Sequence, residues 1–442
     1  MAVQLSDHFT YKKLLRFVFP SIIMMIFTSI YGVVDGFFVS NYVGEEAFEA
    51  VNFIMPFLML PGTVGFMLGT GGSALIAAKL GEGDAKTANR YFSLLVYVGL
   101  GLGALLAAVC MIFLRPIALL LGADTTMLDI CVRYGRIILL ALPAFILQYM
   151  FQSFFVTAEK PKLGLFVTLI SGCTNIVGDF LFIGILRLDV EGAALATAAS
   201  QLVGGILPLF YFVSKNKSLL RLGKTAFYGK ALLRSCLNGS SEMMTNVSMS
   251  LVNMLYNFQL MRFIGNDGIA AYGTLMYVNF IFVSVFIGFS VGSSPIVSFH
   301  FGAGNRAELR NLLNKGMVFI AVSSVLMFLL AMVLAKPLSM LFVGYNRELY
   351  DLTVRGFGIY SFSFLLMGFN IYASAFFTAL GDGMISALIS FLRTLLFQVA
   401  AVLLLPLLWK ADGIWLSVTV AELAAVGVSA WLLAKKRKRY GY

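Results

Sequence analysis

Six long segments without a single charged side chain constrain this chain more than any other feature. They contain no Asp, Glu, Lys or Arg, and they comprise residues 50–78, 91–114, 137–158, 192–214, 268–305 and 356–381. A helix of about 20 apolar residues crosses a hydrocarbon layer of ~30 Å. Of the 442 residues, 60% are hydrophobic and only 12% are charged, against about 25% charged in an average soluble domain. We therefore predict an all-α polytopic membrane protein.

Splitting the apolar runs at charged or turn-rich stretches predicts twelve membrane-spanning helices. With the N-terminus inside, the cytoplasmic segments hold 22 Lys and Arg residues and the opposite side holds nine. Arg393, within the eleventh predicted helix, belongs to neither group. Because Lys and Arg favour the cytoplasmic side, we expect a multi-pass protein of a prokaryotic plasma membrane (cell inner membrane) with both termini in the cytoplasm. The basic residues lie at helix ends rather than in one patch, so the net charge of +11 does not indicate nucleic-acid binding. The predicted spans are 12–42, 46–78, 88–114, 127–157, 162–185, 191–214, 230–263, 268–300, 307–335, 349–380, 384–409 and 413–434.

An internal repeat divides the chain in half. Shifting the sequence by 221 residues places Gly71 on Gly292 and Gly83 on Gly304, and one ungapped register holds from residue 44 to 195. Internal repeats of this kind are typical of transporter folds. We therefore predict two six-helix lobes, related by a pseudo-twofold axis along the membrane normal, around a central cleft. The predicted domains are an N-lobe (1–214), a basic cytoplasmic linker (215–229) and a C-lobe (230–442).

Three predicted helices of the N-lobe bring polar side chains to one depth. At a rise of 1.5 Å per residue, Asp35, Asp179 and Thr197 each lie about 10 Å from the outer ends of their helices. Asn175 shares a helix face with Asp179 at i, i+4. Two carboxylates in a dry site cannot easily both be ionised, so the pair would hold a proton; alternatively, a small hard cation would lie between the oxygen ligands. The C-lobe has no acidic residues at the positions that match Asp35 and Asp179.

These motifs resemble those of the multidrug and toxic compound extrusion (MATE) antiporters, over essentially the whole chain. The resemblance rests on Val33–Gly36 with its helix-1 Asp, on the Asn-x-x-x-Asp of Asn175–Asp179, and on Gly192–Ser200, which places Thr197. Pro20 matches the kink proline in helix 1 of the DinF-like branch, to which MepA-like pumps are close. The resemblance implies that Asp35, Asn175, Asp179 and Thr197 form the site of the coupling cation. It assigns no cofactor and no metal other than a possible Na⁺ at this site.

The C-lobe departs from the other, NorM-like branch of that family. That branch carries an Asp on helix 10, where this chain has Asn370, although the acidic position on helix 7 is retained as Glu242. We therefore assign coupling to the N-lobe, and we expect Glu242 and Glu422 to be structural or to affect substrate range. Met and aromatic side chains accommodate varied ligands, and 21 Met and 41 Phe are present. The predicted residues of the substrate cleft are Tyr31, Gln148, Gln152, Glu242, Asn253, Tyr256, Tyr277, Asn279 and Asn370.

Together these patterns predict a secondary active multidrug efflux transporter. It would export cationic or neutral amphiphiles in exchange for H⁺ or Na⁺ by alternating access, as a monomer surrounded by membrane lipid. The alternative is a flippase of a lipid-linked substrate, which would share the two-lobe architecture. A flippase of that kind should carry a basic intramembrane cavity. Arg393 is the only basic residue in mid-span, which favours the efflux transporter. The chain contains neither an HExxH motif nor a complete Walker A sequence, so we expect neither an enzyme nor an ATP-driven pump.

Overall fold

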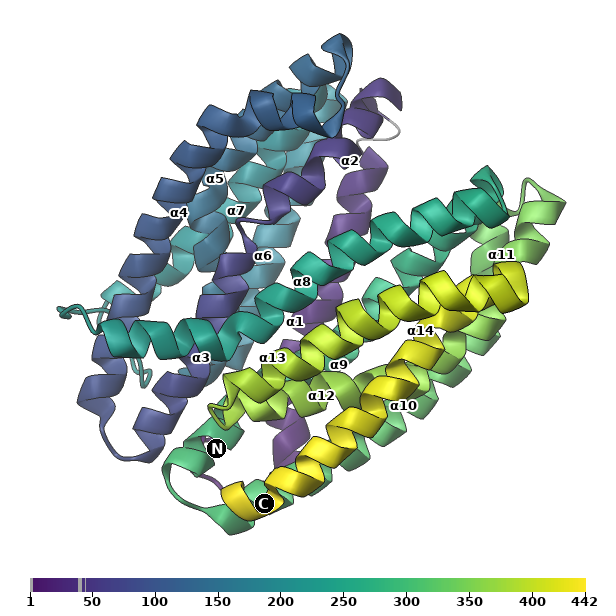
Figure 1. The fold of residues 1–442 in the computed structure, drawn as a ribbon. Helices are drawn as coiled ribbons and strands as arrows, with labels where there is room; N and C mark the ends of the chain where they lie inside the picture. Colours follow the sequence, from purple (N-terminus) through teal and green to yellow (C-terminus); the bar gives the residue numbers. More distant parts are fainter. Residues whose placement is uncertain (1–2, 39–41, 44) are drawn as a thin grey trace.

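The structure, a computed structural model, describes residues 3–38, 42–43 and 45–442, without the side chains at positions 33, 35–37, 45 and 48. All regular secondary structure in this described part is helical (Figure 1). The helices are α1 (Tyr11–Phe38), α2 (Glu45–Met59), α3 (Thr63–Gly81), α4 (Ala85–Leu121), α5 (Thr125–Thr157), α6 (Pro161–Asp179), the π-helix η2 (Phe180–Ile185), α7 (Asp189–Val213), α8 (Gly229–Phe263), α9 (Asn266–Gly302), α10 (Arg306–Val343), α11 (Arg347–Tyr360), the 3₁₀-helix η3 (Ser361–Ser363), α12 (Phe364–Ala379), α13 (Gly383–Phe391), the π-helix η4 (Leu392–Leu396) and α14 (Phe397–Tyr440).

Within the described residues, ten helical stretches are long and apolar enough to cross a membrane. One of them, Gly383–Tyr440, has 58 residues, far more than the ~20 that one crossing needs. Its backbone leaves helical geometry at Lys410, where φ is 49°, so it contains two of the predicted spans. α8 is not among the ten because many Ser, Asn and Thr side chains lower its hydropathy, but its 35 residues are long enough to span. The predicted span 46–78 is found among the ten as Glu49–Gly81. It is not one continuous helix, however, because it is divided into α2 and α3 at Pro61, which supplies no N–H.

The 221-residue repeat has a structural counterpart at the starts of two helices. Asp84 caps α4 and Asn305 caps α10, each accepting a hydrogen bond from the backbone N–H three residues on, at 3.0 Å and 3.1 Å. Such caps satisfy N–H groups that lack partners within the helix. Each cap follows a glycine with positive φ, 83° at Gly83 and 68° at Gly304, a conformation that glycine adopts without steric cost. The sequence repeat therefore recurs in the structure at the starts of these two helices.

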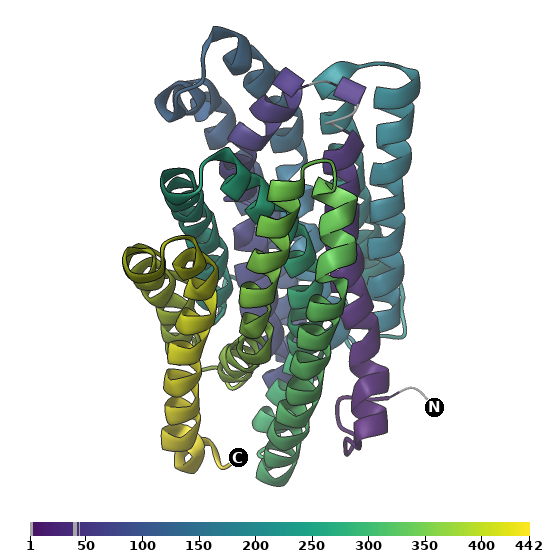
Figure 2. The ribbon, with the colours of Figure 1, turned by 90° about the vertical axis from the view of Figure 1, so that its right-hand side faces the viewer.

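Glycines allow helices of the two halves to cross in close contact. α3 packs against both α8 and α9. A methyl group on Gly239 of α8 would lie 2.7 Å from the carbonyl carbon of Met67, and one on Gly302 of α9 would lie 2.7 Å from that of Ala78. Real Cβ atoms essentially never approach closer than 3.0 Å. These crossings lie toward the end of the bundle that holds both chain termini, which we call the terminal end (Figure 1, Figure 2).

The remaining helices are arranged on either side of this crossing. α4 to α7 lie together on one side, and α10 to α14 lie together on the other (Figure 1). α1 packs against α6 of the first group and against α9, so it joins the two halves. Pro20 is buried within α1, which continues as one helix on both sides of it. The expected kink at Pro20 stays a prediction.

A short segment ahead of α1, residues 3–10, also connects the halves at the terminal end. The Leu5 N–H donates a hydrogen bond to Glu159 Oε1 in the α5–α6 loop, at 2.6 Å. The Phe9 N–H donates to Glu308 Oε1 on α10, at 2.9 Å. The side chains of Leu5 and Phe9 are fully buried. The segment therefore bridges α10 and the α5–α6 loop, and it adds to the close packing of this end.

Candidate functional site

The polar set predicted in the N-terminal half lies where α6 packs against α7. Asn175 and Asp179, on α6, are 1% and 0% exposed. Asn175 Nδ2 donates a hydrogen bond to Thr197 Oγ1 on α7 at 3.5 Å. The two helices approach closely at Gly178, where a methyl group would lie 2.9 Å from the Cβ of Ala196. α6 ends at Asp179 and the π-helix η2 follows directly, and π-helical turns are frequent at functional sites.

α1 carries the fourth residue of this predicted site. It contacts α6 at Gly172, where a methyl group would lie 3.1 Å from Cδ1 of Tyr31. Tyr31 also packs against Phe27, with ring centroids 6.1 Å apart. Position 35 is one turn beyond Tyr31 along the same helix face, but the side chain of Asp35 lies outside the described residues. The participation of Asp35 therefore stays a prediction.

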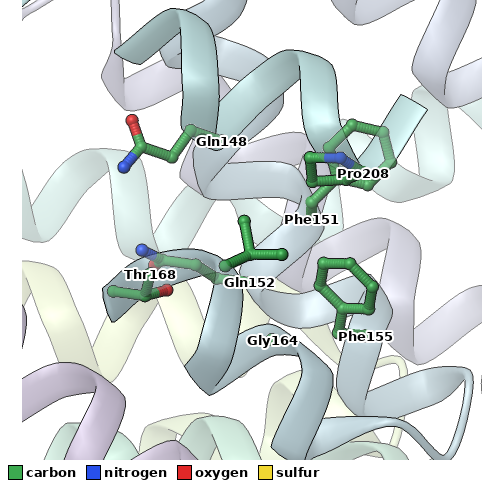
Figure 3. A pocket seen from close by; sticks show the side chains of 9 residues that line it. Gln148, Phe151, Gln152, Phe155, Gly164, Thr168 and Pro208 are labelled. Carbon is green, nitrogen blue, oxygen red and sulfur yellow. The ribbon is translucent and has the colours of Figure 1, made fainter. Parts of the chain in front are cut away.

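Two predicted cleft residues, Gln148 and Gln152, lie instead at a small cavity inside the N-terminal half (Figure 3). The cavity measures about 10 Å³, close to the volume that one water molecule needs. Gln148 Nε2 donates a hydrogen bond to Ser171 Oγ at 3.2 Å, and Ser171 donates in turn to the carbonyl oxygen of Ser200 at 2.8 Å. Gln152 Nε2 is buried without a partner among the described residues. The cavity can hold a water molecule but is too small for an organic substrate.

A larger cavity of about 280 Å³ lies in the C-terminal half, with α1 in one wall. Four predicted cleft residues line it: Glu242, Asn253, Tyr256 and Asn279. The rings of Tyr256 and Tyr272 stack in its wall, with centroids 5.3 Å apart and planes 6° apart. The Tyr272 hydroxyl donates to Asn253 Oδ1 at 3.0 Å. Four further lining side chains are methionines. A cavity that combines apolar and aromatic surface with polar groups is typical of a small-molecule site.

An ion pair lies in the wall of this cavity. Arg393, on η4, donates from Nε to both carboxylate oxygens of Glu422 on α14, at 2.8 Å and 2.9 Å. Asn370 Nδ2 donates to Glu422 Oε2 at 2.7 Å, and Ser429 Oγ donates to Asn370 Oδ1 at 2.9 Å. Glu422 and Asn370 are fully buried. Asn370, predicted for the substrate cleft, thus holds the ion pair in place from behind the cavity wall.

Two other predicted cleft residues do not line the larger cavity. Tyr277 is 39% exposed and stacks on Phe342 at 6.1 Å, and Tyr31 faces α6 as described above. The ion pair of Arg393 with Glu422 was not found by sequence reasoning, although the sequence did single out both residues. A lone basic residue in mid-span is a signal for a buried acidic partner, but it does not say which of several acids is meant.

These features define a class of protein. Long apolar helices in two repeated halves, with buried polar residues and an interior cavity, are the architecture of a membrane transporter. The chain belongs to the MatE family: the family model matches residues 20–181 and again residues 243–403. The two matches are separated by nearly the 221 residues of the internal repeat.

Named relatives agree with this assignment. The chain is 25% identical over 431 residues to the multidrug export protein MepA of Staphylococcus haemolyticus, covering 97% of this chain and 94% of the relative. It is 23% identical over 414 residues to MepA of Staphylococcus aureus, covering 93% and 91%.

Two solved structures share the fold along nearly their whole length. A MATE protein in complex with MaL6 has a TM-score of 0.94 at 20% identity, covering 100% of this chain and 99% of that one. An outward-facing multidrug resistance MATE family transporter of the MOP superfamily has a TM-score of 0.91 at 21% identity, covering 100% and 98%. The protein is therefore an all-α polytopic membrane transporter and not an enzyme.

Proposed function

We propose that the protein is a secondary active multidrug efflux transporter that exports cationic or neutral amphiphiles in exchange for H⁺ or Na⁺. The observation that carries the proposal is the polar set of Asn175, Asp179 and Thr197 in the N-terminal half, of which Asn175 and Asp179 are buried. An acid in mid-membrane is costly and usually serves an ion pathway, and Asp179 is 0% exposed. The relatives are named multidrug export proteins, which supports drug-like substrates.

Alternating access would use the closely packed terminal end as one gate. The distribution of Lys and Arg favours both termini on the cytoplasmic side of the plasma membrane. In that orientation, the packed crossing of α3 with α8 and α9 would close the cytoplasmic side of the transporter. The larger cavity lies beyond that crossing and would hold the substrate in this state. Cation and drug would exchange because each favours a different conformation, since a ligand shifts an equilibrium only through differential affinity.

The larger cavity suits an amphipathic cation. Methionine side chains adapt to ligands of different shape, and the faces of Tyr256 and Tyr272 can hold a cationic group by cation–π contact. Glu242 adds a carboxylate to the lining. The cavity therefore offers an apolar volume, aromatic faces and an acid, which together match an organic cation with a hydrophobic body.

The proposal is tested with purified protein in liposomes that carry a fluorescent organic cation. Dye efflux is compared under an imposed pH gradient and under an imposed Na⁺ gradient, and the gradient that drives efflux identifies the coupling ion. Asp179→Asn should abolish efflux under either gradient, because it removes the ionisable group. Asp129→Asn is the matched control, since the Asp129 side chain is 79% exposed. Concentrative efflux at the wild-type rate by the Asp179→Asn protein would contradict the proposal.

A further inference from the structure

Three charged side chains line the larger cavity, and each comes from a different helix. They are Glu242 of α8, Arg393 of η4 and Glu422 of α14. The other described lining residues, on α1, α9, α11, α12 and α13 as well as on these helices, are uncharged. The cavity thus contains two carboxylates and one guanidinium, and its formal charge is one net negative charge.

The guanidinium of Arg393 is paired with one of the two acids, Glu422. Both oxygens of the Glu422 carboxylate accept hydrogen bonds from Arg393 Nε, and Asn370 donates a further one. The Glu422 side chain is 0% exposed and that of Arg393 is 12% exposed. The two side chains stay together, because separating them would leave each without its partner in a medium of low dielectric constant.

Glu242 is in a different situation. No hydrogen bond or ion pair joins its carboxylate to another residue that the structure describes, although Arg393 is within electrostatic reach. It is therefore the acid that remains available to a ligand. The stacked rings of Tyr256 and Tyr272 lie in the same cavity, so a single cationic group can contact both a carboxylate and aromatic faces.

We propose that Arg393 sets the charge selectivity of this cavity: as a cation tethered to Glu422, it leaves one free carboxylate and so restricts the site to singly charged organic cations. A dication would bring a second charge that no available acid compensates, and an uncompensated buried charge is strongly unfavourable. Without Arg393, the same cavity would present two carboxylates. This inference rests on the proposed function, since it concerns which cations the transporter accepts.

The test measures affinity in detergent, where no ion gradient is needed. The probes are tetraphenylphosphonium, a monocation, and p-xylylene-bis(triphenylphosphonium), a dication of the same chemical type. The wild type should bind the monocation at least tenfold more tightly than the dication. Arg393→Gln should shift the ratio of the two affinities at least tenfold toward the dication, because the cavity then carries two free carboxylates. Arg393→Lys, which keeps the positive charge, should keep the wild-type ratio.

Two further variants separate charge from structural damage. Arg393→Gln combined with Glu422→Gln removes both members of the ion pair, so the ratio should return to that of the wild type even if overall affinity falls. Glu422→Gln alone leaves Arg393 unpaired against Glu242, so binding of the monocation should fall at least tenfold. Arg393→Gln alone could fail to fold only because Glu422 is then a buried charge without its partner, which is destabilising. In that case these two variants test the role of Arg393 in charge selectivity.

A ratio that stays within twofold of the wild type in folded Arg393→Gln would overturn the inference, and so would wild-type binding of the monocation by Glu422→Gln. If the wild type binds neither probe, the proposed function fails together with this inference. If it binds the monocation but the ratios do not follow the charge of the cavity, only the role of Arg393 is refuted.

Discussion

Adding one methyl group at Gly239 should open the terminal end of the molecule. In Gly239→Ala the new Cβ would meet the backbone of Met67: the carbonyl oxygen is the nearest atom, the carbonyl carbon lies at 2.7 Å and Cα at 2.9 Å. Carbon atoms in favourable contact are about 3.5–4.0 Å apart, so α3 and α8 must separate by about 1 Å. All three obstructing atoms belong to the backbone of α3, so no rotation of a side chain can relieve the contact.

The energetic consequence follows from what overpacking costs. An inserted methyl in a closely packed contact costs about 1–3 kcal/mol, and here the cost falls only on the conformation in which α3 and α8 are in contact. At 1.36 kcal/mol per factor of ten, the ratio of closed to open protein should fall by a factor of roughly 5–150. We expect the variant to fold but to populate a state open at the terminal end.

The measurement is the distance between spin labels on Lys86→Cys and Ala307→Cys, in a background that lacks the four native cysteines. Both positions are exposed, one in the first turn of α4 and one in the first turn of α10. Gly239→Ala should add a population at longer distance by double electron–electron resonance. Gly101→Ala is the control, because nothing lies within 4 Å of a methyl group at that position. Identical distance distributions in the two alanine variants would refute the argument that glycine packing holds this end closed.

Two further predictions concern the segment of residues 3–10. Burial raises the pKa of the Glu159 carboxyl, opposed by the hydrogen bond from Leu5. The folded state therefore binds the proton more tightly than the unfolded state does, and stability falls as pH rises from about 4.3 through the raised folded pKa. Glu159→Gln should lack this loss, so its melting temperature in detergent should rise relative to the wild type across that window; a difference that is independent of pH would contradict this. Phe9→Ala should destabilise the protein by about 3–5 kcal/mol, because the ring is 0% exposed and packs edge-on against Phe17. Thermal unfolding should show little change in the control Phe227→Ala, whose side chain is 76% exposed, and an equal effect of the two changes would refute the packing argument.

The helices and their repeat could be predicted from the sequence because both leave a one-dimensional signal. Long charge-free segments report directly on burial in hydrocarbon. The 221-residue offset correctly paired Gly83 with Gly304, since tight turns with positive φ demand glycine wherever they recur. The division of span 46–78 at Pro61 was missed because a proline in an apolar run can also lie within a continuous transmembrane helix, as Pro20 does here.

Contacts between helices could not be predicted in the same way. Depth along a helix follows from the residue count, but the direction in which a side chain points also depends on how regular the helix is. Arg393 lies in a π-helical turn, where an extra residue per turn changes the face to which later side chains belong. Its pairing with Glu422, 29 residues away on another helix, therefore has no counterpart in a pattern of period 3.6. Gln148 and Gln152 were expected in the substrate cleft, but the sequence did not say that they border a separate cavity of only about 10 Å³.

The bridge formed by residues 3–10 has a consequence for biosynthesis. These residues are made early, yet Phe9 hydrogen-bonds to a residue 299 positions later, and Leu5 to one 154 positions later. At about 5–20 residues per second, a ribosome needs roughly 15–60 s to make the intervening chain. During that interval the buried side chains of Leu5 and Phe9 have no α10 to pack against. The segment can complete its contacts only after most of the helices have been made, so a stretch near the start of the chain is among the last to reach its final place.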